Sequence, residues 1–218
     1  MHACASFKAR ADLRRRKVTE AARKLFVGKG FHLTGMAEIA TASDVHVGQI
    51  YRDFPSKEAI VAAIVEADFA ALVDSDSLRT AVEQGDRAAV LAAIERFFEP
   101  SPCEEMMPEI MAEAARNPRI AEIVAGLDAR FRDTLARALG VFAPGDAMRE
   151  RRENVAEVIT VLVIGMCHRA VASVALSEPI RAVIAREIDT LAAESAAIDS
   201  CRLDGGLDRP HGLGYAKA

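Results

Sequence analysis

Residues 46–52 carry side chains that can read base pairs, at the spacing of one short helix. Gln49 can form paired hydrogen bonds with adenine, and Arg52 can do the same with guanine or hold a phosphate. Gly48 leaves room for the backbone to come close to a duplex, and the hydroxyl of Tyr51 can donate to a phosphate oxygen. These residue types predict a helix that enters the major groove of DNA, which is about 12 Å wide.

Four neighbouring residues extend the predicted contact surface. His46 and Val47 stand at the start of the same helix, where they can touch base edges or a thymine methyl group. Thr34 can donate its hydroxyl to a phosphate, and Lys57 can add its charge together with the amides of a helix start. The spacing alone is equally compatible with a helical hairpin whose polar residues are only solvated.

The elements that must position these side chains are short helices. Apolar residues at helical spacing predict a first helix over residues 8–28, and Thr34 is placed to cap a second. Residues 43–45 are too few and too polar for anything but a turn, and a third helix follows over about 46–52. Two short helices separated by such a turn form a helix-turn-helix. The apolar residues expected to hold them together are Ile39, Ala40, Val45 and Ile50.

The segment over residues 34–60, TGMAEIATASDVHVGQIYRDFPSKEAI, resembles the N-terminal signature of the tetracycline-repressor (TetR) family. The residues that match the family pattern are Thr34, Ile39-Ala40, Gly48, Ile50, Tyr51, Phe54 and Lys57-Glu58. Upstream, Ala21-Ala22, Leu25-Phe26 and Gly30-Phe31 resemble the first helix of the family and its exit. The resemblance covers roughly a quarter of the chain. It implies an all-α regulator that binds operator DNA as a homodimer and responds to a small-molecule effector, with a repressor mechanism by analogy.

Three departures from the family pattern affect the predicted DNA contacts: the turn sequence, His46 in place of the usual small cap, and Asp53. The turn usually reads Ala-Gly-Val-Ser, whereas residues 43–46 read Ser-Asp-Val-His. Asp44 tolerates left-handed backbone geometry better than most residues, so the turn is expected to form. Asp53 stands where the family often has His or Tyr near a phosphate. Its carboxylate would repel DNA unless it pairs with Arg52 or a neighbouring Lys, and no contact is assigned to it.

The charge distribution separates a basic N-terminal part from an acidic remainder. Residues 1–60 carry 11 Lys and Arg against 6 Asp and Glu, whereas the other residues carry 17 against 26. Only the N-terminal part is therefore suited to meet a polyanion. We expect a three-helix DNA-binding domain over residues 1–55, a larger helical ligand-binding and dimerisation domain over 56–200, and a flexible tail over 201–218.

Helices separated by prolines, glycines or short polar runs are expected throughout the larger domain. The predicted ranges are 56–73 (capped by Ser56), 86–99, 103–115, 118–140, 150–176 and 178–198. No run of alternating β-branched residues is long enough for a strand. The last two helices have wide apolar faces, and the family resemblance implies that they pair with a second subunit. A simple core role explains the same faces equally well.

An effector pocket between these helices would have adaptable apolar walls of Phe and Met side chains. The candidate lining residues are Phe97, Phe98, Met107, Met111, Phe131, Met166 and His168. Ordinary core packing is the alternative for each of them. Glu113 and Arg169 are further candidates for polar anchors in such a pocket, or else ordinary ion-paired residues.

Several other functions find no support in the sequence. It has no GxSxG, P-loop or dinucleotide fingerprint, and its four scattered cysteines form no metal-binding pattern, so neither catalysis nor a metal or cofactor is predicted. The N-terminus lacks the apolar region of a signal peptide, and charged residues interrupt the most apolar stretch, so we expect a cytoplasmic protein without a membrane span. Two alternatives remain: a helical enzyme with an incidental helix-turn-helix, and a regulator that binds protein and takes no small-molecule ligand.

Overall fold

The computed structural model describes residues 2–73, 76–99, 103–171 and 178–204, and all regular structure within them is helical, as predicted. Short 3₁₀ turns, Arg96–Phe98, Leu139–Val141 and Asp146–Met148, lie between some of the helices. The α-helices are α1 (His2–Lys29), α2 (Met36–Ser43), α3 (Val47–Asp53), α4 (Lys57–Val73), α5 (Asp76–Gln84), α6 (Arg87–Glu95), α7 (Cys103–Ala114), α8 (Pro118–Ala138), α9 (Arg149–Val171) and α10 (Glu178–Asp204).

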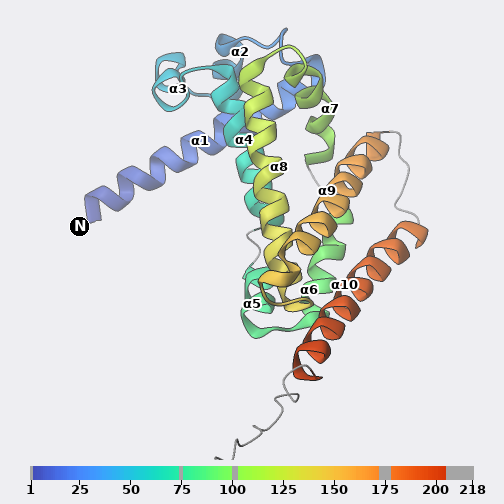
Figure 1. Ribbon diagram of the computed structural model, residues 1–218. Coiled ribbons are helices and arrows are strands. Elements are labelled where there is room, and N and C mark those ends of the chain that lie inside the picture. Colours follow the sequence, from blue (N-terminus) through green and yellow to red (C-terminus); the bar gives the residue numbers. More distant parts are fainter. Residues whose placement is uncertain (1, 74–75, 100–102, 172–177, 205–218) are drawn as a thin grey trace, which may run out of the picture.

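The helices form two groups connected lengthwise by α4 and α8 (Figure 1). At one end, α1, α2 and α3 form what we call the head. At the other end, α5, α6, α9 and α10 form the body together with the far halves of α4 and α8. The long helix α1 projects away from the rest of the molecule at its N-terminal end. The head thus presents α3 at one extremity of the molecule.

Each group has its own hydrophobic core. The body core contains apolar side chains of α5, α6, α8, α9, α10 and the 3₁₀ turns, among them Phe97, Phe131, Leu135, Ile159 and Leu191. The head core contains Val18, Ala22, Phe26, Phe31, Ile39, Val45, Ile50, Phe54, Ile60, Val61, Ile64, Val65, Met106, Ile110 and Ile120. The head core therefore includes residues of α4, α7 and α8, far beyond the helices that the sequence assigns to DNA binding.

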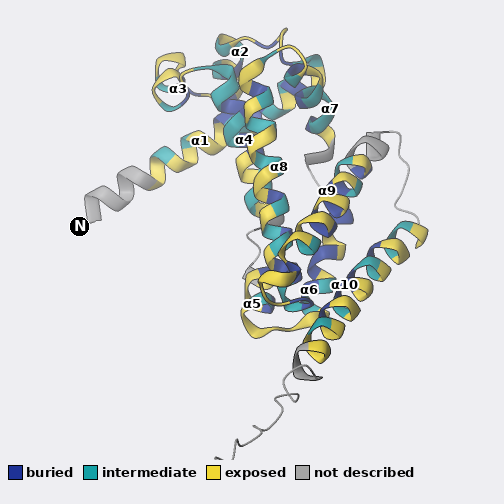
Figure 2. Ribbon diagram, in the orientation of Figure 1, coloured by how far each residue is buried: buried dark blue, intermediate teal, exposed yellow. Residues whose placement is uncertain are grey.

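Helices α4 and α8 contribute to both cores along their length. Ile60 and Ile64, in the first half of α4, are buried in the head core, whereas Phe69 packs against the body core. In α8, Ile120 lies in the head core and Phe131 in the body core. Burial is thus distributed along both helices (Figure 2), which makes them the structural connection between the two ends.

The structure differs from the predictions at one helix cap and in one additional helix, and it confirms another cap. Thr34 does not cap α2: the N-cap is Gly35, and the Thr34 hydroxyl donates to the carbonyl oxygen of Gly30 instead. Helix α5 was not predicted, because its start among polar residues reads as a break. The predicted cap of α4 is confirmed, since the Ser56 hydroxyl accepts a hydrogen bond from the amide of Ala59 at 3.3 Å.

The C-terminal predictions fall partly outside the described residues. Helix α9 is described to Val171, so the predicted end of this helix at 176 lies outside them. Helix α10 continues to Asp204, so the tail does not begin at 201, and residues 205–218 are not described. Within the described part of the chain, none of the helices combines the length and apolarity that crossing a membrane requires.

Candidate nucleic-acid interface

Helices α2 and α3 form a helix-turn-helix whose inner faces are fully packed. Ile39 of α2 and Ile50 of α3 are completely buried in the head core. Between the helices, Asp44 adopts left-handed geometry with φ 54°, and its backbone amide donates to the carbonyls of Ala40 and Thr41 at the end of α2. The prediction that Asp sustains this turn in place of the usual Gly is confirmed.

The outward face of α3 carries the predicted base-reading side chains together. His46 is the N-cap residue of α3 and is exposed, as is Gly48. Val47 is 43% exposed and Tyr51 52% exposed, so both side chains are accessible to a partner. The remaining two predicted residues, half-buried Gln49 and exposed Arg52, lie on the same short helix. The structure thus brings six of the eight predicted DNA-contacting residues onto one accessible surface.

The prediction for Thr34 is wrong in its chemistry. This residue is 1% exposed, and its hydroxyl donates to the carbonyl oxygen of Gly30 at 2.9 Å. A buried hydroxyl with an internal acceptor has no proton left for a phosphate. Thr34 instead closes the loop between α1 and α2, which sets where α2 begins.

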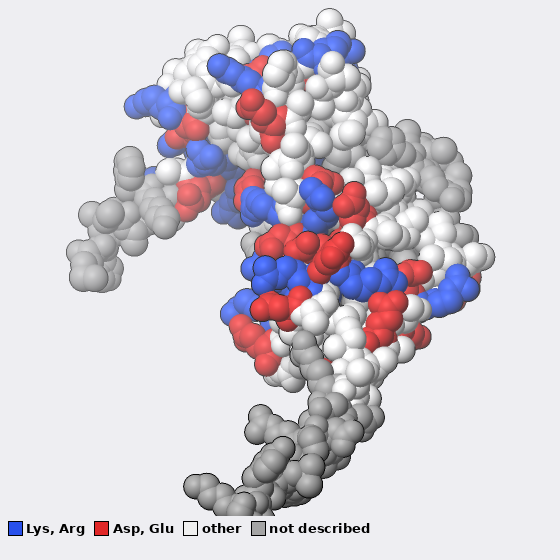
Figure 3. All heavy atoms as spheres, in the orientation of Figure 1, with Lys and Arg blue, Asp and Glu red and all other residues white. Residues whose placement is uncertain are grey.

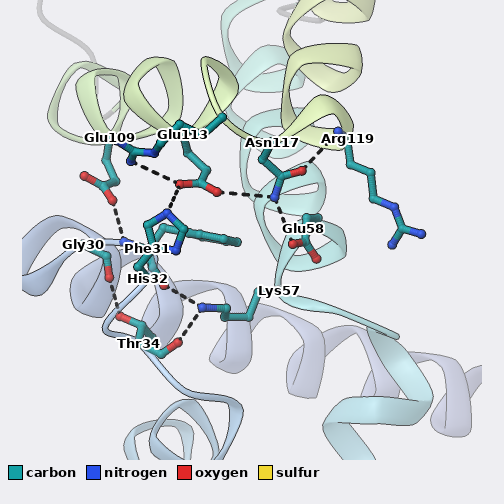
Figure 4. Close-up of polar contacts among 11 residues, drawn as sticks. Gly30, Phe31, His32, Thr34, Lys57, Glu58, Glu109, Glu113, Asn117 and Arg119 are labelled. Atoms are coloured by element: carbon teal, nitrogen blue, oxygen red, sulfur yellow. Dashed lines mark hydrogen bonds and ion pairs between the residues drawn. The ribbon is translucent and has the colours of Figure 1, made fainter.

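Lys57, predicted to contact a phosphate, makes contacts within the protein that the sequence did not indicate. Its ammonium group donates to the carbonyl oxygens of Phe31 at 2.7 Å and Thr34 at 2.9 Å (Figure 4). The same nitrogen lies 4.3 Å from the centre of the Phe31 ring, a cation–π distance. Two of the three ammonium donors of Lys57 thus join the start of α4 to the loop that precedes α2.

Asp53, whose carboxylate was a concern for DNA binding, pairs with a residue that the sequence did not indicate. The guanidinium of Arg14 in α1 donates to both carboxylate oxygens, at 2.5 Å and 2.9 Å. These hydrogen bonds hold the pKa of the Asp53 carboxyl below its usual range, even though burial acts in the opposite direction. The carboxylate is thus paired, but its hydrogen-bond partner is Arg14 and not Arg52 or a nearby Lys, the partners considered from the sequence. Arg14 is 39 residues distant in sequence, and only the basic run at 14–17 could have suggested it.

The next residue of α1 completes the attachment of α3. Arg15 donates to the backbone carbonyl of Asp53 at 2.8 Å, and its guanidinium lies 4.3 Å from the centre of the Phe54 ring. Because cations interact favourably with the carbonyl end of a helix, this contact stabilises the C-terminus of α3. Arg14 and Arg15 together fix the end of α3 against α1, and sequence reasoning missed both.

The surface charge differs between the two ends of the molecule. In the view of Figure 3, Lys and Arg side chains lie at the outer edge of the head around α3, whereas acidic and basic side chains are closely mixed over the body. Many of the body charges pair with each other, such as Arg130 with Glu66 at 2.6 Å and Arg151 with Glu194 at 2.9 Å. On the face shown, the mixed charges of the described body residues offer no uniform field for a polyanion.

The predicted effector-binding residues do not form one group. Phe97, Phe98, Phe131 and Met166 are buried in the body core, where the rings of Phe97 and Phe131 meet edge to face at 5.1 Å. Met107 and Met111 are half-buried on α7, whose buried residues belong to the head core. The side chain of His168 lies outside the described residues. Glu113, considered as a polar anchor for a ligand, contacts His32 of the head instead.

Two family profiles match the chain and together account for most of it. The profile described as "Bacterial regulatory proteins, tetR family" matches residues 18–64, and that of the "BetI-type transcriptional repressor, C-terminal" matches residues 86–193. The first match contains the helix-turn-helix and the first part of α4. The second contains most of the helices of the body.

Curated relatives are transcriptional regulators, but the matches are partial. The transcriptional activator FasR of Mycolicibacterium smegmatis is 34% identical over 90 residues, which are 40% of each chain. The regulator UidR of Escherichia coli is 30% identical over 114 residues, 50% of this chain and 56% of that protein. The chain therefore matches about half the length of these relatives or less.

Solved structures share the fold at low sequence identity. A TetR-family regulator from a Rhodococcus species aligns with a TM-score of 0.63 at 18% identity, covering 83% of this chain and 98% of the other. One from Mesorhizobium loti aligns with a TM-score of 0.60 at 18% identity, covering 87% and 98%. The two profiles, the helix-turn-helix and this shared architecture agree: the chain belongs to the TetR family of bacterial transcriptional regulators.

Proposed function

We propose that this protein is a repressor that binds operator DNA as a homodimer through α3 and releases it when a small molecule binds the body. The main support for this proposal is the exposed face of α3. It presents Gln49 and Arg52 on a helix whose other side is packed in the head core and whose C-terminus is held by α1. The sequence-based division assigns residues 1–55 to DNA reading and 56–200 to sensing and pairing. The C-terminal match to a repressor profile supports the direction of regulation.

The residues of α3 would divide the work of recognition. Gln49 would read adenine and Arg52 guanine or a phosphate, through paired hydrogen bonds in the major groove. His46 and Val47 would touch base edges or a thymine methyl, and Tyr51 would donate to a phosphate. Gly48 has open space where a Cβ would lie, so the backbone there can approach the duplex.

Apolar residues on α9 and α10 support a dimer. Val158 and Val161 of α9 are 47% and 62% exposed, and Val183 of α10 is 37% exposed. Val158 and Val161 are three residues apart and therefore lie on one face of α9. An exposed apolar face on the two C-terminal helices suits the self-complementary surface of a two-fold dimer. Such a dimer would present two α3 helices to half-sites about one DNA turn apart.

An effector would act by preferring one arrangement of the body over another. Helix α4 reaches from the head core to the body core, so a shift of the body core would reorient the head. The effector would need differential affinity for the two arrangements, because equal affinity shifts no equilibrium. The buried side chains proposed for its pocket are Phe97, Phe98, Phe131 and Met166, with His168 as a polar partner and Met107 and Met111 nearer the head.

Selection of bound fragments from random double-stranded DNA tests the proposal directly. The wild-type protein should enrich a two-fold symmetric site and lose affinity steeply as salt rises. Gln49→Ala should relax the preference at one position in each half-site, by about 1–3 kcal/mol. Gln84→Ala, which removes an exposed Gln from α5, serves as the matched control and should leave the site unchanged. Failure of the wild-type protein to retain any duplex at low salt would refute DNA binding.

A further inference from the structure

The buried apolar side chains of α7 belong to the head core, although the helix also contacts α9 of the body and the sequence places it among the body helices. Met106 and Ile110 of α7 are 1% and 3% exposed and lie in the head core with Phe26 and Phe31. The cavity left between these residues measures about 10 Å³, which is room for about one water molecule. The close fit means that α7 and the end of α1 cannot shift relative to each other without opening a void.

Two carboxylates of α7 hold the loop that leads from α1 to α2. The backbone amide of Phe31 donates to Glu109 Oε1 at 2.5 Å, and His32 Nε2 lies 2.8 Å from Glu113 Oε2 (Figure 4). Glu109 and Glu113 are four residues apart and therefore share one face of the helix. Gly30 eases this approach, since a Cβ at that position would lie 3.2 Å from Glu109 Oε1, a tight contact that the carboxylate would have to relieve by shifting.

Glu113 is buried and fully engaged, unlike an ordinary surface carboxylate. It is 3% exposed, and it also receives Arg116 Nη2 and Asn117 Nδ2, each at 3.4 Å. Asn117 Nδ2 further donates to Glu58 Oε1 of α4 at 3.1 Å. A buried charge with several partners leaves an uncompensated group behind when one partner is removed, so this geometry resists displacement. These contacts of Glu109, Glu113 and Asn117, which we call the junction, join α7, the start of α4 and the loop over residues 30–34.

We propose that Glu109 and Glu113 are positioning residues that fix the DNA-reading helices directly to α7. The loop they hold leads into α2, and α2 carries α3 through the turn at Asp44. A displacement of α7 would therefore move the reading helices by a route that does not pass along α4. This role in recognition rests on the proposed DNA binding, whereas the junction itself is a property of the free protein.

Hydrogen exchange of the free, full-length protein tests the junction without DNA. Glu109→Ala and Glu113→Ala should accelerate exchange in the segment over residues 30–36 by about tenfold or more, because each removes a hydrogen bond to a charged group. Glu109→Gln should restore most of the protection, since the amide oxygen still accepts from Phe31. Glu105→Ala removes an exposed carboxylate from the same helix and should leave exchange unchanged. Exchange equal to the Glu105→Ala control in both Ala variants would overturn the junction.

DNA binding tests whether the junction positions the reading helices. Affinity is measured for two 30-base-pair duplexes, one of random sequence and one from the selection described above. Glu113→Ala should weaken affinity for the selected duplex several-fold more than affinity for the random one, because misplaced reading helices lose base contacts before phosphate contacts. Accelerated exchange with unchanged affinity for the selected duplex would overturn the positioning role. If the wild-type protein bound neither duplex, the proposed function would fail, while the exchange experiment would still decide the junction. Should the Ala variants lose helical circular dichroism, Glu109→Gln and His32→Leu replace them. His32→Leu removes the donor to Glu113 and is then expected to accelerate exchange, whereas Glu109→Gln is not.

Discussion

Replacing Arg14 by Ala should unmask a negative charge beside the DNA-binding surface. In the wild-type protein the Asp53 carboxylate receives two hydrogen bonds from Arg14, and the two side chains are only 14% and 28% exposed, respectively. Arg14→Ala leaves the carboxylate at the end of α3 without this partner. The variant should therefore lose both stability and DNA affinity.

The expected size of the effect follows from this geometry. Exposed ion pairs contribute about 0.2–1 kcal/mol, whereas hydrogen bonds to charged groups contribute about 1.5–3 kcal/mol when they are removed from water. The Arg14–Asp53 pair is two-pronged and mostly buried, but part of the guanidinium is solvated. We therefore expect a coupling free energy of about 1–2 kcal/mol between the two side chains.

A double-mutant cycle of Arg14→Ala, Asp53→Ala and the double variant measures this coupling through urea unfolding. In parallel, Asp53→Ala should partly restore the DNA affinity that Arg14→Ala loses, because it removes the unmasked charge. The exposed neighbour Arg16, replaced by Ala, provides a control that removes the same charge from α1 without touching Asp53. A coupling below about 0.3 kcal/mol would show that the pair does not stabilise α3. The absence of any rescue would show that Arg14 does not mask the carboxylate from DNA.

Three further predictions follow from described contacts. Because the pKa of Asp53 is lowered on folding, its contribution to stability is present above the unfolded value of about 3.9 and is lost as the pH falls through the lower folded value. The difference in unfolding free energy between wild type and Asp53→Asn should therefore shrink as the pH drops from 6 to below 4. Lys57→Met should lower the unfolding free energy by about 1.5–3 kcal/mol, because it removes two internal hydrogen bonds, whereas Lys17→Met, at an exposed lysine, should not. A flatter salt dependence of DNA binding without a loss of stability would instead favour a phosphate contact. Val161→Asp should yield a folded monomer by analytical ultracentrifugation, while Val27→Asp, at an exposed valine of the head, should remain dimeric. A dimer in both variants would exclude the α9 face as the dimer interface.

Local sequence patterns were sufficient to predict the helix-turn-helix. The spacing of Ile39, Val45 and Ile50 identifies the buried side of two short helices, and Phe54 before a proline marks the end of the second. Asp44 could be assigned to a left-handed turn because few other residue types adopt that geometry. These features depend on neighbours within a few residues, which a single sequence displays.

The partners of polar groups could not be predicted in the same way. Arg14 meets Asp53 across 39 residues, and Glu109 meets Phe31 across 78, so no periodic pattern connects them. Thr34 and Lys57 have residue types suited to phosphate, yet the fold uses both to close the loop before α2. The chemistry of a side chain indicates what it can bind, but tertiary packing decides whether its donors are already occupied.

The distribution of buried side chains bears on how reading heads could be exchanged between related regulators. A fragment cut after residue 55 would lose Ile60 and Ile64 together with Met106, Ile110 and Ile120, and it would expose the apolar surface that these residues cover. Such a fragment should aggregate or unfold in isolation. A functional chimera would need to transplant α7 and the adjoining ends of α4 and α8 with the N-terminal segment, so the smallest portable recognition module is discontinuous in the gene.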